Sequence, residues 1–101
     1  MRTLLLSGLA LTALAMLPAP AMADIAQDRS AAIRLCRAEA ARQAGVGLEQ
    51  VRFDEIRTRA RRFMVDLDLW RDGRLTNVRC IVERGAALSI ASVTPALRAG
   101  P

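Results

Sequence analysis

The side chains in this sequence that could do chemistry are two cysteines, ten carboxylates and fifteen arginines, and there is no histidine. Without histidine the chain has no imidazole base, no histidine metal ligand and no Ser-His-Asp arrangement. Asp66 and Asp68 would share one face of a strand and could act as a carboxylate pair, but the hairpin described below places Arg79 opposite Asp66. The Gly-Val-Gly stretch at residues 45 to 47 follows no strand and precedes no helix, so it is not a phosphate loop. We therefore expect a protein that is not an enzyme and has no cofactor.

The two cysteines, Cys36 and Cys80, are expected to form a disulfide rather than a reactive or metal-binding site. Two widely spaced thiols do not make a zinc site, so no metal is expected. The predicted mature chain of 78 residues (101 − 23) is small enough to need a stabilising cross-link. An even pair of cysteines in an exported chain usually provides one. Two inert buried thiols are the alternative.

The N-terminus has the pattern of a secretory signal peptide. Arg2 is its one charge, residues 4 to 17 carry none, and Ala21-Met22-Ala23 offers a small-x-small cleavage site. As a helix, those 14 uncharged positions (17 − 4 + 1) would span about 21 Å, which is short of a membrane core about 30 Å thick. A membrane anchor is the disfavoured alternative. The expected organisation is a signal peptide at 1–23, a single domain at 24–93 and a flexible tail at 94–101, with a periplasmic or secreted mature chain that has no transmembrane segment.

Residues 62 to 84 predict a β-hairpin, because apolar and polar residues alternate on both sides of Asp72-Gly73. Asp-Gly favours a two-residue type I′ turn, and a turn of that length sets the register of the strands. In that register one face pairs Leu69 with Thr76, Leu67 with Val78, Val65 with Cys80 and Phe63 with Val82. The opposite face pairs Asp66 with Arg79 and Arg62 with Glu83. Both pairs join opposite charges, which agrees with the register that the turn and the apolar pattern predict.

Residues 24 to 44 predict a helix that ends at Gly45 as a left-handed C′ residue. Its thin apolar stripe consists of Ile25, Ala32, Ile33, Cys36 and Ala40, whereas Arg34, Arg37 and Ala41 should point away. Cys36 lies on this stripe and Cys80 on the apolar face of the hairpin, so their disulfide should join helix to sheet. The predicted fold is α+β: one N-terminal helix packed on a three- to four-stranded antiparallel sheet.

Two further strands are expected to complete the sheet. In the first, residues 51 to 60, Ile56 is out of phase with Val51 and Phe53, and a β-bulge at Asp54-Glu55 would restore the phase on an edge strand. The second covers residues 86 to 93, and the sequence leaves open which way its apolar residues face.

A single helix covers only one face of this sheet, and the other face would carry large apolar residues. These are Trp70 opposite Leu75 and Met64 opposite Ile81. Tryptophan and methionine are enriched in interfaces, so we interpret the four residues as a partner-binding surface. Cover by the last strand, the tail or a loop is the alternative.

Arginines gather between the first two predicted strands, at Arg57, Arg59, Arg61 and Arg62. Guanidinium groups bind phosphate and carboxylate, which makes this cluster a candidate site for anionic lipid, lipopolysaccharide or an acidic protein partner. A merely solvated, charged strand face is the alternative. We do not expect nucleic acid as a partner, because no aromatic residues stand beside the arginines to stack on bases.

The run FMVDLDLWRDG at residues 63 to 73, followed by Val78, Cys80, Val82 and Gly85, resembles PepSY domains. The resemblance covers roughly residues 28 to 93. It implies one helix packed on an antiparallel sheet, and a noncatalytic binding module linked to restraint of peptidases or to envelope regulation. The sequence therefore favours a periplasmic binding or inhibitory module that contacts an envelope protein or peptidase through the sheet face. A basic envelope-associated protein that binds anionic lipid is the alternative.

Overall fold

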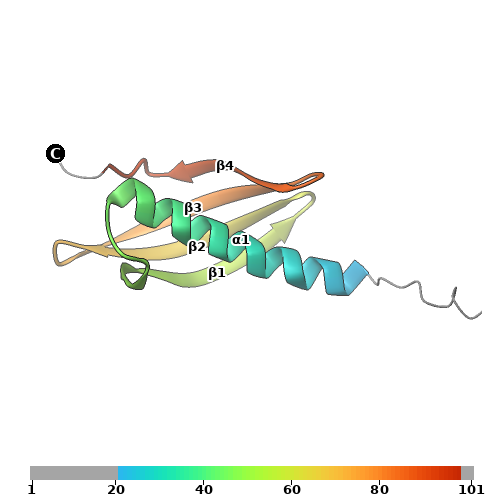
Figure 1. Ribbon diagram of the computed structural model, residues 1–101, viewed down its shortest axis with the longest axis horizontal. Helices are drawn as coiled ribbons and strands as arrows, with labels where there is room; N and C mark the ends of the chain where they lie inside the picture. Colours follow the sequence, from blue (N-terminus) through green and yellow to red (C-terminus); the bar gives the residue numbers. More distant parts are fainter. Residues whose placement is uncertain (1–20, 99–101) are drawn as a thin grey trace, which may run out of the picture.

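The computed structural model describes residues 21–98, which form one helix and one antiparallel sheet (Figure 1). The elements are α1 (Ala21–Ala44), the short 3-10 turn η2 (Leu48–Gln50), β1 (Val51–Arg59), β2 (Arg62–Arg71), β3 (Arg74–Arg84) and β4 (Leu88–Thr94). The strands lie in chain order, β1-β2-β3-β4, and α1 crosses one face of the sheet. The predicted α+β architecture is confirmed. Most of the predicted signal peptide, residues 1 to 20, lies outside the described residues.

The β2–β3 hairpin has the predicted register in every row. Asp72 and Gly73 both have positive φ angles, 55° and 74°, as a type I′ turn requires. The register pairs Arg62 with Glu83 at one end and Arg71 with Arg74 next to the turn. Local turn chemistry and the alternating pattern therefore specify this half of the sheet.

Strand β1 contains the predicted bulge and lies at an edge of the sheet. Its pairing with β2 shifts between Phe53 and Glu55, so Asp54 is the extra residue and Ile56 returns to the face that carries α1. The two-residue turn into β2 places Ala60 at a φ of 54°, a conformation that costs a non-glycine residue about 1–2 kcal/mol. Strand β1 is thus interrupted by a bulge in its first half and connects to β2 through a tight two-residue turn.

Strand β4 resolves the phase that the sequence left open. Leu88, Ile90 and Val93 pair with Arg84, Val82 and Cys80, and a second bulge at Ala91 keeps all three on the helix side.

Residues 95 to 98, which fall in the expected tail, lie against the end of α1. Leu97 is buried against the core, and its N–H donates to Gln43 Oε1 at 3.4 Å. The side chain of Arg71 donates to the carbonyls of Ala44 and Arg98 at 3.2 and 2.6 Å. Leu97 lies three residues beyond the end of β4, and its side chain is buried near the end of α1. The composition of this segment does not predict that burial.

The core lies between α1 and the middle strands. Ala32, Cys36, Ala40 and Ala44 are fully or nearly fully buried at four-residue spacing, and the larger core side chains come from the strands. The predicted disulfide is present: Cys36 in the middle of α1 is bonded to Cys80 on β3, with 5.9 Å between their Cα atoms. Because the buried stripe of the helix is almost entirely alanine, the helix lies close to the sheet but contributes little apolar volume.

The predicted outward face of α1 is partly wrong. Ala41 is buried, because the returning C-terminal segment widens the covered face of the helix. Arg37 is half-buried and donates to the carbonyls of Val51 and Leu48 at 2.8 and 2.9 Å. It fastens the start of β1 to the helix rather than pointing into solvent.

The helix is terminated as predicted at Gly45, which has a φ of 71°. The N–H of Val46 donates to the carbonyl of Ala41 at 3.1 Å, and that of Gly45 reaches Arg42 at 3.3 Å, the two bonds of a Schellman motif.

Candidate functional site

The predicted partner surface consists of two separate apolar pairs on the sheet face opposite α1. Trp70 and Leu75 are cross-strand neighbours beside the β2–β3 turn, and they are 44% and 47% exposed. Met64 and Ile81 are also cross-strand neighbours, but both are half-buried. Because Met64 lies six residues before Trp70 on one strand, the two pairs are separated by about 20 Å.

Polar rows fill the space between the two pairs. Arg79 Nε donates to Asp66 Oδ1 at 2.9 Å, as the sequence predicted, and this contact raises the pKa of Arg79 above its ordinary value. In the next row the side-chain amide of Asn77 donates to Asp68 Oδ1 at 2.8 Å. Asp66 and Asp68 therefore each have a polar partner of their own. These two hydrogen-bonded rows separate the Trp70–Leu75 pair from the Met64–Ile81 pair.

The four predicted anion-binding arginines lie together around the β1–β2 turn, but they differ in their partners. Arg57 Nε lies 3.1 Å from Glu55 Oε2, and Arg62 Nη2 lies 3.5 Å from Glu83 Oε2. Within residues 25–98, the side chains of Arg59 and Arg61 make no ion pair. Two of the four guanidinium groups thus form ion pairs on the surface, and those of Arg59 and Arg61 could bind an anion at the turn.

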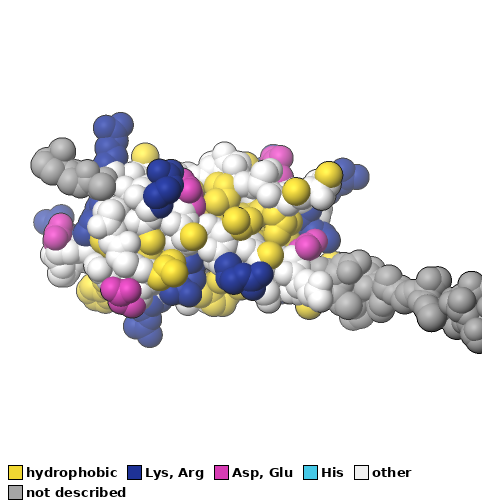
Figure 2. Space-filling model, in the orientation of Figure 1, with side chains coloured by type: hydrophobic (Ala, Val, Ile, Leu, Met, Phe, Trp, Pro, Cys, Tyr) yellow, Lys and Arg dark blue, Asp and Glu magenta, His cyan; other side chains and the backbone are white. Residues whose placement is uncertain are grey.

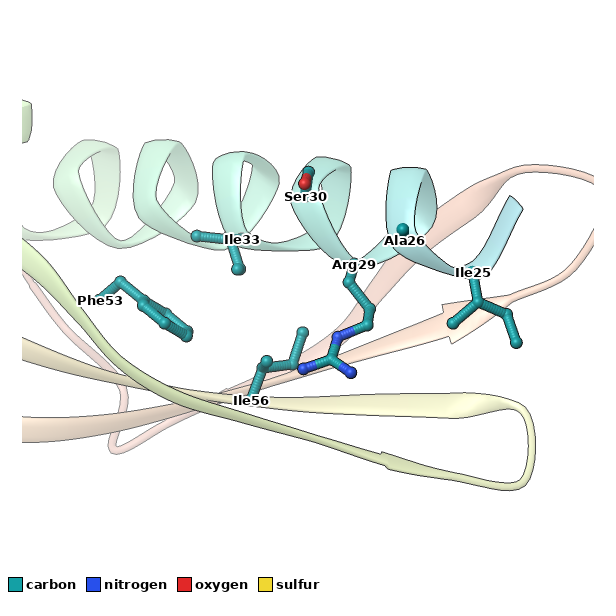
Figure 3. A pocket seen from close by; sticks show the side chains of 7 residues that line it. All are labelled: Ile25, Ala26, Arg29, Ser30, Ile33, Phe53 and Ile56. Carbon is teal, nitrogen blue, oxygen red and sulfur yellow. The ribbon is translucent and has the colours of Figure 1, made fainter. Parts of the chain in front are cut away.

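A third surface, which the sequence reasoning missed, is an apolar groove between the first half of α1 and β1. It has a volume of about 500 Å³ and is lined by Ile25, Arg29 and Ile33 from the helix and by Phe53 and Ile56 from the strand. Figure 3 shows the side chains of Arg29 and Ile33 reaching from the helix towards those of Phe53 and Ile56. Phe53 is 43% exposed although it points to the helix side of the sheet.

The groove exists because α1 is held over the middle of the sheet and has small side chains where it touches. At the start of β1, Val51 is fully buried, whereas Phe53 and Ile56 further along are not. In Figure 2, which shows the face that carries α1, apolar side chains remain visible between arginines. The signal that could have located the groove was present in the sequence: Ile25 and Ile33 beside an alanine stripe, and a bulge that turns Ile56 to the same side.

Among the side chains of residues 25–98 there is no group of three or more His, Cys, Asp or Glu that could hold a metal ion. Within residues 21–98, no helix is long and apolar enough to cross a membrane. Comparisons of the chain with family models, curated proteins and solved structures found no match.

Proposed function

We propose that this protein is a noncatalytic, exported binding module that contacts a protein partner through the sheet face opposite α1. The observation that carries the proposal is the exposure of Trp70 and Leu75, adjacent large apolar side chains on a face that no helix within residues 21–98 covers. Interfaces concentrate their binding energy in a few such residues, with tryptophan prominent among them. The polar rows next to this pair would form the hydrogen-bonding rim.

Two features support export and a PepSY-like role. The buried Cys36–Cys80 bond is the kind of link that persists in an oxidising compartment such as the periplasm. One helix on an antiparallel sheet is the architecture that the PepSY resemblance implies. The proposed partner is an envelope protein or peptidase that the module restrains or positions.

Affinity capture from periplasmic extract with the oxidised protein tests this function. A protein captured by the wild type and lost with Trp70→Ser supports the proposal, and Leu35→Ser is a matched control because Leu35 is an exposed apolar residue on α1. We expect Trp70→Ser to weaken binding by tenfold or more, since truncated interface tryptophans often cost about 2 kcal/mol. If Trp70→Ser retains every partner that the wild type captures, the sheet face is not the contact surface.

A basic envelope-associated protein is the second candidate, favoured by Arg59 and Arg61 at the β1–β2 turn, which form no ion pair with the side chains of residues 25–98. It predicts binding to anionic vesicles that weakens as salt rises, because exposed charges are screened beyond about 10 Å at 0.1 M salt. Arg59→Gln with Arg61→Gln should abolish that binding, whereas Trp70→Ser should leave it unchanged.

A further inference from the structure

We propose that the α1–β1 groove and the free edge of β1 together bind an extended segment of a partner protein, in which apolar and acidic residues alternate. The groove is on the side of the sheet that carries α1 and the free edge belongs to β1, whereas Trp70 and Leu75 lie on β2 and β3. The site is therefore distinct from the Trp70–Leu75 pair and does not depend on the function proposed for that pair.

The edge of β1 supplies the backbone contacts. Within the described residues, β1 is paired on one side only, with β2. An edge strand presents a row of N–H and C=O groups to which another extended chain can add. After the bulge at Asp54, the pairing of residues 55 to 59 with β2 is continuous, which leaves a regular edge of five residues, about 17 Å long.

The two faces of an added strand would meet different chemistry. Side chains on the helix side would lie beside Ile56 and Thr58 and enter the groove between Phe53 and Ile33. Side chains on the other side would lie beside Arg57 and Arg59. Because side chains alternate along a strand, the best ligand is apolar at every second position and charged between.

The charges select acids over bases. Arg59 lies on the side that the charged residues of the ligand would face, and Arg29 lies in the groove wall; neither side chain forms an ion pair within residues 25–98. Residues 21–98 carry 14 arginines and 10 acids, a net charge of +4 (14 − 10). A positive surface attracts an acidic segment and repels a second copy of this chain.

Titration calorimetry of the oxidised protein tests the site with two acetylated hexapeptides, one alternating valine with glutamate and the other valine with lysine. We expect the glutamate peptide to bind at least about fivefold more tightly, as expected when two or more exposed ion pairs form. Methylating alternate backbone nitrogens of that peptide should abolish binding when the methylated N–H groups face β1, because the strand can then no longer pair.

Variants of the protein separate the groove from the rest of the surface. Phe53→Ser should weaken binding of the glutamate peptide by about fivefold or more, since large aromatic side chains dominate the energetics of the contacts that bury them. Arg59→Glu should bring the two peptides to similar affinity or reverse their order, because Arg59 lies on the side that the charged residues of the peptide would face. Leu35→Ser and Arg34→Glu are the matched controls on α1, because both residues are exposed and neither lines the groove. Circular dichroism verifies the fold of each variant.

Two results would overturn the proposal. One is equal binding of the glutamate and lysine peptides to the wild type, or no binding of either. The other is a dimer, detected by sedimentation, that Phe53→Ser dissociates while the peptides do not bind, because the occupant would then be a second copy. In a nuclear magnetic resonance titration, the peptide should perturb the amides of residues 55 to 59 and leave those of Trp70 and Leu75 unchanged, which distinguishes this site from the outer face.

Discussion

Breaking the Cys36–Cys80 bond should remove a large part of the stability of this domain. The two cysteines are 44 residues apart in sequence, and the bond joins the middle of α1 to the central strand β3. For a loop of this length the chain-entropy relation gives about 4 kcal/mol. A domain of 78 residues is expected to have a free energy of unfolding of about 4 to 12 kcal/mol in total.

The packing of α1 makes this contribution decisive for the helix. Besides Cys36, its buried side chains are Ala32, Ala40, Ala41 and Ala44. At about 0.8 kcal/mol for each buried methyl group, the four alanines together contribute about 3 kcal/mol. The disulfide therefore stabilises the docked helix about as much as all its buried alanines do, and the reduced chain should lose helical structure first.

Urea unfolding of the oxidised protein and of the same protein in reductant, followed by circular dichroism, measures the effect without changing an atom other than sulfur. With a slope of about 1 kcal/mol per molar urea, we expect the midpoint to fall by about 4 M. The double variant Cys36→Ala/Cys80→Ala is the matched control, and reductant should not affect it. If the oxidised and reduced proteins unfold within about 0.5 M urea of each other, the entropic reasoning is refuted and burial alone holds the helix.

Replacing Ala60 by glycine should raise the free energy of unfolding by about 0.5–1 kcal/mol in urea titrations. The reason is that the strain of alanine at a positive φ costs more free energy than the extra conformational entropy that glycine adds to the unfolded chain. Arg37→Met should lower the free energy of unfolding by roughly 1–3 kcal/mol, since two carbonyls before and at the start of β1 lose their donor, whereas Arg34→Met should have little effect. The pKa of Glu39 is lowered from 4.5 to about 2, chiefly by a hydrogen bond from Arg42, so its stabilisation is complete above pH 4.5 and disappears as the pH falls towards 2. The stability difference between wild type and Glu39→Gln should therefore shrink across that range, and a constant difference would contradict this assignment.

The hairpin, the bulge and the disulfide could be predicted from the sequence because each depends on local chemistry or on a pattern with one solution. Asp72-Gly73 selects the turn, and the period of two then places Cys80 on the apolar face. Cys36 falls on the apolar stripe of the helix, so the two sulfurs meet through the core. The bulge at Asp54 was predicted from Ile56 alone, since an out-of-phase apolar residue on a half-buried strand demands an extra residue.

The surfaces, in contrast, were decided by the tertiary structure. How far α1 covers β1 depends on the angle and closeness at which an alanine-rich helix packs, and this leaves Phe53 exposed beside Arg29. The return of Leu97 to the end of α1 likewise requires knowing where the helix ends in space. Alternation along a strand assigns a side chain to a face, but exposure on that face depends on neighbours that are distant in sequence, and only the packed chain brings those neighbours together.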